Sequence, residues 1–205
     1  EGREGVRRDR RGRGGGENRF SFAHMSTLPL PSSIPSGSTG PTKFCLFDLE
    51  TRAVTNFNDP HALARTDILE VAVIRFMLEM DLNPEVGFKV KVLDKFATFI
   101  RPENDAPVDA YTTSLNGITT EMVRGGMSLR KTCEHLRHLM EGHTWVGHNI
   151  TRFDNVVLLG AFKRAGVPSP RWTDLLDTLL VAREGLKGTL RSFNLGACAR
   201  HFGVS

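Results

Sequence analysis

Strand-like apolar runs begin about forty residues into the chain. Predominantly apolar stretches at residues 44–51, 68–78 and 90–100 are separated by polar segments and are of strand length or a little longer. The second stretch is apolar at most positions, which predicts a strand covered on both faces. The third ends at Arg101-Pro102, where proline stops further pairing. Three successive strands predict a meander.

Beyond residue 118 the apolar period lengthens to three or four residues. Leu129, Cys133, Leu136 and Met140 fall on one face of a helix, for which Ser128 is the expected N-cap. The remaining elements predicted, in chain order, are a strand at 143–148 and helices at 152–165, 175–182 and 192–202. Strands followed by alternating helices and strands are typical of an α/β protein, in which helices pack against a mixed sheet.

Residues 1–41 show no such period. They are rich in Arg and Gly and then in Ser and Pro, a composition that predicts a disordered tail ahead of one domain at 42–205. The net charge of +4 is concentrated in this tail, because the first 24 residues hold seven Arg against four acids. The high isoelectric point is therefore weak evidence that the folded part binds nucleic acid.

The three cysteines, Cys45, Cys133 and Cys198, form no CxxC pair and leave an odd number. Both facts argue against a zinc finger and against a secreted disulfide framework. They favour a reducing intracellular compartment, which we expect to be the cytoplasm, the nucleus or both. No run of about 18 apolar residues occurs, so we expect no association with a membrane.

Two acids lie at the end of the first apolar run, in the sequence Phe47-Asp48-Leu49-Glu50-Thr51. Residues two apart on a strand point to the same side and are separated by roughly 6 to 7 Å. Asp48 and Glu50 are therefore expected to share a face. Carboxylates close together in apolar surroundings must protonate or bind a cation, and hard oxygen ligands suit Mg²⁺ or Mn²⁺.

A third acid, Asp154, follows the fourth predicted strand and falls in the first turn of the next helix. The spacing Thr151-x-x-Asp154 matches a capping box, in which an acid at the third helical position satisfies a backbone N–H and suits the helix dipole. Taken alone, this spacing favours a structural role for Asp154 over a catalytic one.

Together, Phe47–Thr51 and Gly147–Leu158 resemble the first two motifs of the DEDD exonucleases, the family of RNase T and of the proofreading subunit of bacterial DNA polymerase III. The second segment fits the family's N-x-x-x-F-D-x-x-x-L pattern throughout. Asn116–Thr119 falls between the motifs, where members carry a similar turn. The resemblance extends from about residue 42 to the C-terminus and is closest to plant NEN-type exonuclease-domain proteins.

The resemblance implies an RNase H-like fold and a 3′→5′ exonuclease that hydrolyses the terminal phosphodiester of single-stranded DNA or RNA with two divalent ions, Mg²⁺ or Mn²⁺. Asp48 would bridge both ions. Glu50 would hold the ion that carries the attacking water, and Asp154 the ion that faces the leaving group. The residues expected to contact the substrate are Leu49, Thr51, His148 and Asn149.

The chain departs from the family at the last motif, which requires a fourth acid and a Tyr or His base. His201 has no acid after it, and Tyr111 has none at the required spacing. Asp174 and Asp177 lie in the region that joins two predicted elements, where an acid before an apolar run is usually an N-cap, so we expect both to be caps rather than replacements. We therefore expect a fragment of a longer protein whose exonuclease domain is incomplete at its C-terminus, binds metal weakly and hydrolyses slowly.

Two other functions are compatible with the sequence. One is a catalytically impaired exonuclease-fold module that binds nucleic acid or a partner without chemistry, consistent with the absent last motif. The other is an RNase H-type endonuclease, against which the close match of the second motif argues. No motif favours DNA over RNA, because that choice depends on whether a 2′-OH is read at the terminal sugar.

Overall fold

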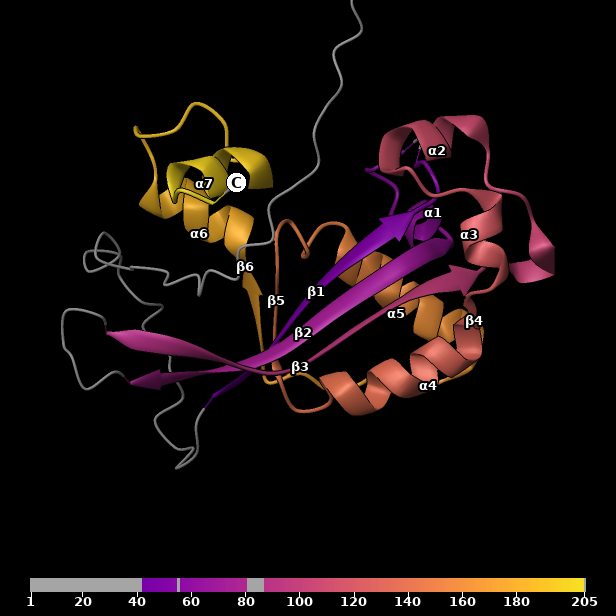
Figure 1. The fold of residues 1–205 in the computed structure, drawn as a ribbon, viewed down its shortest axis with the longest axis horizontal. Helices are drawn as coiled ribbons and strands as arrows, with labels where there is room; N and C mark the ends of the chain where they lie inside the picture. Colours follow the sequence, from indigo (N-terminus) through magenta and orange to yellow (C-terminus); the bar gives the residue numbers. More distant parts are fainter. Residues whose placement is uncertain (1–41, 55, 81–86, 205) are drawn as a thin grey trace, which may run out of the picture.

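The computed structural model describes residues 42–54, 56–80 and 87–204, which form one mixed sheet with helices packed against it (Figure 1). The α/β class is confirmed, whereas the tail predicted at 1–41 lies outside the described residues. None of the described helices is long and apolar enough to cross a membrane. In chain order, the helices and strands of this part are β1 (Lys43–Thr51), α1 (Pro60–Ala64), β2 (Ile68–Met80), β3 (Phe88–Arg101), a 3₁₀ turn (Glu103–Asp105), α2 (Ala110–Asn116), α3 (Thr120–Arg124), β4 (Met127–Ser128), α4 (Leu129–Met140), β5 (Thr144–Gly147), α5 (Asp154–Ala165), β6 (Asp174–Asp177), α6 (Thr178–Gly185) and α7 (Leu195–His201).

The sheet has the strand order β4-β3-β2-β1-β5-β6. β1, β2 and β3 pair antiparallel as the predicted meander, whereas β5 runs parallel to β1 and β6 runs parallel to β5. Within the described residues, β4 pairs with Ile100 and Arg101, at the end of β3. Because β1, β5 and β6 are parallel, their carboxyl ends meet at one edge of the sheet. Both acidic motifs lie at this edge.

One face of the sheet carries the hydrophobic core. Cys45, Phe47 and Leu49 alternate toward this face and are buried. They form one cluster with side chains of α1, α4 and α5, the helices that cover this face (Figure 1). The Phe47 ring meets the indole of Trp145 on β5 edge-on, with 5.5 Å between centroids. All three cysteines are buried free thiols.

No helix of the described residues covers the opposite face of the sheet over β1, β2 and β3. On β2, Ala72 is exposed and Phe76 is partly exposed, so the prediction of a strand covered on both faces is wrong. The physical reason is that α1, α4 and α5 share one side of the sheet, while α6 and α7 gather beside β6 (Figure 1). The apolar surface left open includes the stacked rings of Phe44 and Phe76, 5.1 Å apart, and two half-exposed valines of β3, Val90 and Val92.

Helix α4 is found as predicted, with Ser128 as its N-cap. The Ser128 hydroxyl accepts a hydrogen bond from the Lys131 amide at 3.4 Å. Helix α5 begins at Asp154, two residues after the predicted start, because Phe153 takes the N-cap position with non-helical dihedral angles. This start places Asp154 at the first helical position, beside β1.

Helices α1 and α5 approach each other closely at Gly160. A Cβ on this glycine would lie 2.1 Å from the carbonyl oxygen of Ala64, so only glycine allows the two backbones to come this near. One turn further along α5, Arg164 donates hydrogen bonds to the carbonyl oxygens of Ala64 and Thr66. These contacts fix the connection between α1 and β2 against α5.

The chain after residue 173 differs from the prediction. Asp174–Asp177 forms the edge strand β6 rather than the approach to a helix, and α6 begins at Thr178. The two leucines of β6 pair with β5, so the neighbouring strand determines the structure of a segment too short to have a clear period. The last helix is confirmed within its predicted range, as Leu195–His201. Helices α1, α2 and α3 were not predicted because none of these short segments has a sustained apolar period.

Candidate active site

Asp48 and Glu50 lie on the open face of β1, because the residues between and before them point into the core. Glu50 is in register with Glu70 on β2. Burial raises the pKa of Glu50, and the charges of Asp48 and Glu70 raise it further. Surrounding protein also raises the pKa of Asp48, although this residue stays open to solvent. Acids facing each other across two strands repel, which favours a cation between them.

Asp154 is the third acid of the site and is almost fully buried, with 5% of its surface exposed. Its Oδ1 accepts a hydrogen bond from the Leu49 amide at 3.2 Å, so it is attached to the peptide between Asp48 and Glu50. Burial raises the pKa of Asp154 to about 7, and the charge of Asp48 adds to this increase. The acids of two motifs that lie far apart in the sequence thus meet at one point of β1.

The capping-box interpretation of Asp154 is wrong. Helix α5 has Phe153 at its N-cap position and no side-chain hydrogen bond there, so Thr151 does not cap it. The Asp154 carboxylate accepts from β1 instead of closing its own helix. Because the helix start is not explained by capping, the buried carboxylate is better explained by its position beside Asp48.

Asp177 fixes the loop that carries Asp154. Its carboxylate accepts hydrogen bonds from the amides of Asn149 at 2.8 Å, Thr151 at 3.1 Å and Leu179 at 3.0 Å. Burial raises the pKa of Asp177, but these hydrogen bonds outweigh it and leave the pKa lowered. Asp177 is the N-cap of α6, as predicted.

For Asp174 the predicted N-cap role is wrong, because this residue opens a strand. It is the first residue of β6, it is exposed, and its Oδ1 accepts from the neighbouring amide of Leu175. The short apolar segment that follows it pairs with β5 instead of starting a helix. Asp174 therefore has no part in the acidic site.

His148 lies beside the site with both ring nitrogens engaged within the protein. Nδ1 is 3.1 Å from the Thr178 hydroxyl and Nε2 is 2.9 Å from the carbonyl oxygen of Phe193. Asn149, the next residue, has a φ of 65° and donates its amide to Asp177. The predicted substrate contacts of His148 and Asn149 stay predictions, and the observed hydrogen bonds give both residues a positioning role.

A hollow of about 210 Å³ opens beside Glu50. Leu49 and Thr51, two of the predicted substrate contacts, line it, whereas His148 and Asn149 do not. The complete lining is Leu49, Glu50, Thr51, Arg52, Ala53, Val54, Phe57, Leu115, Asn116 and Phe153. The hollow therefore joins the end of β1 to the start of α5 and the end of α2.

Sequence reasoning missed several residues of this site. Asn116 falls in the turn between the two motifs that resembles a turn of family members. That resemblance could have identified it as a residue of the site. Glu70 could be found only from the register of β1 and β2. Phe57 and Leu115 lie in a loop and a short helix without a recognisable pattern, and nothing in their spacing marks them.

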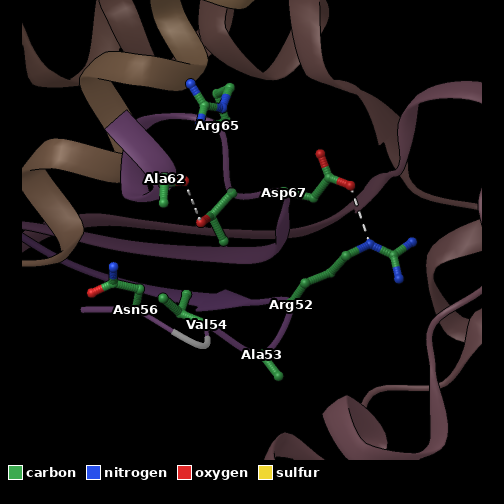
Figure 2. A pocket seen from close by; sticks show the side chains of 8 residues that line it. Arg52, Ala53, Val54, Asn56, Ala62, Arg65 and Asp67 are labelled. Carbon is green, nitrogen blue, oxygen red and sulfur yellow. Dashed lines mark hydrogen bonds and ion pairs between the residues drawn. The ribbon is translucent and has the colours of Figure 1, made fainter. Parts of the chain in front are cut away.

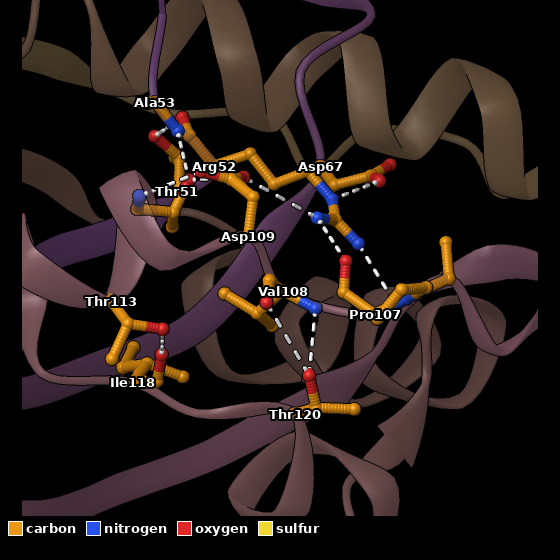
Figure 3. Close-up of polar contacts among 12 residues, drawn as sticks. Thr51, Arg52, Ala53, Asp67, Pro107, Val108, Asp109, Thr113, Ile118 and Thr120 are labelled. Carbon is orange, nitrogen blue, oxygen red and sulfur yellow. Dashed lines mark hydrogen bonds and ion pairs between the residues drawn. The ribbon is translucent and has the colours of Figure 1, made fainter.

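Arg52 connects the end of β1 to two other segments. Its guanidinium donates to Asp67 at 3.1 Å (Figure 2), to the carbonyl oxygen of Pro107 at 2.8 Å (Figure 3) and to that of Ala106, also at 2.8 Å. Figure 2 shows the second hollow, of about 270 Å³, between the residues after β1 and those after α1. Arg52, with Ala53 and Val54, is common to the lining of both hollows.

Helix α2 is attached to the same end of β1. The Asn116 side chain donates to the carbonyl oxygen of Thr51 at 3.1 Å, and the Ala53 amide donates to the Thr112 hydroxyl at 3.0 Å. Each of these bonds joins residues far apart in the sequence. The backbone that carries Glu50 and Thr51 is thus held by β2 on one side and by α2 beyond its end.

The acids of the site suit a hard divalent ion in their chemistry. Along 42–54, 56–80 and 87–204, no ion pair joins a Lys or Arg to Asp48, Glu50 or Asp154. Oxygen ligands of this kind are those that Mg²⁺ and Mn²⁺ prefer. Within the same ranges, no three Asp, Glu, His or Cys side chains converge closely enough to enclose an ion. The carboxylate oxygens are thus of the type that these ions prefer, while the described side chains do not form a closed coordination shell.

Most of the chain is similar in sequence to proteins of a known family. Residues 46–205 match the RNase T family model, described as Exonuclease. The chain is 29% identical over 166 residues to protein NEN4 of Arabidopsis thaliana, covering 81% of this chain and 60% of that protein. It is 31% identical over 163 residues to a PolC-type DNA polymerase III of Pediococcus pentosaceus, covering 80% of this chain and 10% of the polymerase.

Solved structures share the fold. E. coli exonuclease I in complex with a dT13 oligonucleotide superposes with a TM-score of 0.59 and 22% identity, covering 80% of this chain and 36% of that one. A product-bound exonuclease I superposes with a TM-score of 0.62 and 21% identity, covering 81% of this chain and 39% of that one. The predicted RNase H-like arrangement of the sheet and helices is therefore confirmed. The chain spans less than two thirds of the length of these relatives.

Proposed function

Because the chain belongs to the RNase T family of exonucleases, we propose that its folded part removes nucleotides from the 3′ end of single-stranded DNA or RNA by metal-dependent hydrolysis of the terminal phosphodiester. The predicted relationship to this family, and to plant NEN proteins within it, is confirmed. The observation that carries the proposal is the hydrogen bond from the Leu49 amide to Asp154, which joins the acids of both motifs.

Exonucleases of this family generally use divalent metal ions. In the proposed site Asp48, Glu50 and Asp154 would hold two ions, Mg²⁺ or Mn²⁺, with Glu70 adding negative charge from β2. Bound there, such ions supply the positive charge that stabilises the attacking hydroxide and the leaving 3′ oxygen. The ion pairs observed in the described residues leave these three acids unneutralised, which supports this role.

The remaining residues of the site bind and position. Leu49 and Thr51 line the hollow next to Glu50, where the terminal nucleotide would lie. Asp177 holds the loop before α5, and with it the position of Asp154. Arg52 holds the end of β1 through the carbonyl groups of residues 106 and 107. Such fixed positions are what two-ion catalysis requires of the protein.

The test is release of labelled mononucleotides from 3′-end-labelled single-stranded DNA and RNA in Mg²⁺ or Mn²⁺. We expect Asp48→Asn to lower the rate by at least about 10²-fold, because the stabilisation of developing charge by a single group is of that size. Asp174→Asn is the matched control, since it also replaces a carboxylate by an amide. Asp174 is exposed and lies at the end of β6 that is remote from Asp177 and the acidic site. This variant should keep the rate of the unaltered chain.

The products distinguish the proposal from an endonuclease, because an exonuclease releases the 3′ label as a mononucleotide and internal cleavage releases it in oligonucleotides. Equal rates in Asp48→Asn and the unaltered chain would contradict the assignment of Asp48. Thermal unfolding of both variants shows whether a lost rate reflects lost structure.

A second candidate function is binding of nucleic acid without hydrolysis. It is favoured by one observation, that no three metal-ligating side chains of the described residues converge around a point. This alternative predicts that fluorescence anisotropy detects oligonucleotide binding while no mononucleotide is released. It also predicts that Asp48→Asn leaves the affinity unchanged.

A further inference from the structure

Arg152 is an exposed cation on the loop that leads from β5 to α5, two residues before Asp154. The Cα atoms of these two residues are at most about 7 Å apart, because successive Cα atoms are separated by about 3.8 Å. Within the part of the chain that the structure describes, the Arg152 guanidinium forms no hydrogen bond or ion pair. Arg52, two residues after Glu50, differs because Asp67 and two carbonyl groups engage its guanidinium. The charge of Arg152 is therefore left open next to the acidic site.

The position of Arg152 is unfavourable for the stability of α5. Arg152 precedes the N-terminal end of this helix, which is the positive end of the helix dipole and repels a cation. The carboxylate of Asp154 accepts a hydrogen bond from Leu49 on β1 and forms no ion pair with Arg152. Arg137, also an exposed arginine, lies instead in the last turn of α4, where the dipole favours a cation. Folding thus explains the charge at Arg137, whereas an anion from outside the chain would explain the charge at Arg152.

The backbone that carries Arg152 is fixed. Asp177 accepts hydrogen bonds from the amides of Asn149 and Thr151, and Ile150, between them, is buried in the hydrophobic core. The Arg152 amide donates to the carbonyl oxygen of Asn149 at 3.3 Å. The side chain therefore starts from a defined point, and a ligand has to order only its outer part.

Under the proposed function, the ligand at this end of the sheet is a polyanion. The phosphate of the cleaved bond would lie on the ions at Asp48, Glu50 and Asp154, and the terminal nucleotide would lie in the hollow beside Glu50. Arg152 does not line that hollow. The anionic groups left for Arg152 are the phosphates of the strand that enters the site, on the 5′ side of the cleaved bond.

We propose that Arg152 binds a backbone phosphate of the substrate on the 5′ side of the cleaved bond. The inference rests on the proposed function, which supplies the strand and its direction. A guanidinium suits this role because its planar donors form paired hydrogen bonds to two oxygens of one phosphate. A phosphate contact carries no sequence information, so Arg152 would raise the affinity for every base sequence, in DNA and in RNA alike.

The experiment measures the Kd of the full chain for fluorescent single-stranded oligonucleotides in Ca²⁺ at a series of KCl concentrations. We expect Arg152→Ala to raise the Kd at low salt by about 10-fold or more, the effect of one hydrogen bond to a charged group. The slope of log Kd against log salt should fall by about 0.7, because one phosphate contact to a single strand is lost. Arg152→Lys should keep the slope, since its charge remains.

Oligonucleotides with one neutral methylphosphonate linkage, moved along the strand, locate the contact. At the linkage that Arg152 binds, the neutral group should weaken binding by the unaltered chain, and Arg152→Ala should cause no further loss. At the other linkages, the loss in Arg152→Ala should stay complete.

Arg137→Ala is the matched control, because it removes an exposed arginine far from the acids. Helix α4 ends beside the first residues of β5, where the Trp145 indole donates to the Met140 carbonyl oxygen, whereas the acids lie at the carboxyl end of β5. This variant should change neither the Kd nor the slope. Thermal unfolding should show Arg152→Ala to be at least as stable as the unaltered chain, because a cation repelled by the helix dipole is removed.

The proposal is overturned by an unchanged salt slope in Arg152→Ala, by a loss that persists at every neutral linkage, or by an unaltered chain that binds no oligonucleotide. Binding that depends on Arg152, without release of mononucleotides in Mg²⁺ or Mn²⁺, would refute hydrolysis and leave the phosphate contact supported.

Discussion

The carboxyl group of Asp154 connects stability to pH at the scale of a single residue. Burial and the charge of Asp48 raise its pKa to about 7, whereas in the unfolded chain it titrates near 4. Between these values the folded protein binds more protons than the unfolded chain. Without divalent metal, the free energy of unfolding should therefore fall as the pH rises from about 4 to about 7.

Asp154→Asn should remove this dependence. The amide oxygen can still accept from Leu49, and no buried charge remains. We expect the variant to be more stable than the unaltered chain at pH 8 by on the order of 2–4 kcal/mol, and equally stable near pH 4. Urea unfolding in the presence of a chelator, at a series of pH values, measures this. Parallel pH profiles of the two proteins would contradict it.

Residues on a regular strand were the easiest to predict. The side chains of Asp48 and Glu50 share a face because the period of a strand is two, and this holds for any sheet that β1 joins. Asp154 was found from the motif, but its bond to Leu49 depends on the packing of α5 against β1. Phe57 was missed because a loop side chain has no period, and only the folded position shows that it lines the hollow.

At the scale of elements, the contact of α1 with α5 depends on a missing side chain. Gly160→Ala would place a methyl group 2.1 Å from the carbonyl oxygen of Ala64, and the backbone there cannot move without shifting α1. We expect this change to lower the free energy of unfolding by about 1–3 kcal/mol, or more if α1 detaches. Chemical denaturation followed by circular dichroism measures it.

Gly125→Ala is a suitable control for Gly160→Ala. Gly125 follows α3 with a φ of −84°, and an added Cβ would meet no atom within 4 Å. It should leave stability unchanged within about 1 kcal/mol, because the dihedral angles suit alanine. An equal loss in both variants would mean that the approach of the two helices does not explain the role of Gly160.

Elements with a long apolar period were the easiest to predict, although the short elements β5 and α7 were also found within their predicted ranges. β1, β2, β3 and α4 follow from runs of nine residues or more. β6 has four residues, and its pairing with β5 decides its conformation. Helices α1, α2 and α3 begin at side-chain caps, Asp59, Asp109 and Thr119, which are too common in sequences to mark so short a helix.

At the scale of the whole molecule, the helices are unequally divided between the two faces of the sheet. The open face carries apolar side chains of β1, β2 and β3, and β3 is paired on its outer side only at Ile100 and Arg101 within the described residues. An open apolar strand near an edge is a site at which chains associate. Self-association should therefore depend on this face.

Val90→Thr together with Val92→Thr should reduce self-association without changing the fold. Both valines are about half exposed, and threonine keeps the branched shape that strands favour. Static light scattering at increasing protein concentration measures self-association. The free energy of unfolding of the double variant should stay within about 1 kcal/mol of that of the unaltered chain. Val181→Thr, on α6, makes the same substitution away from this face and serves as the control. Unchanged scattering in the double variant would mean that self-association does not depend on this face.

The burial of the cysteines has a practical consequence for spectroscopy. Burial raises the pKa of Cys45 to about 12 and that of Cys133 to about 11, and Cys198 is 8% exposed with its thiol directed to the carbonyl oxygen of Phe193. Alkylating reagents react with the thiolate, which Cys45 and Cys133 do not form at neutral pH, and the burial of Cys198 keeps such reagents from its sulfur. A cysteine introduced at Tyr111 would be the fast-reacting thiol of the folded chain, so a dye can be attached on α2 while all three native cysteines are kept.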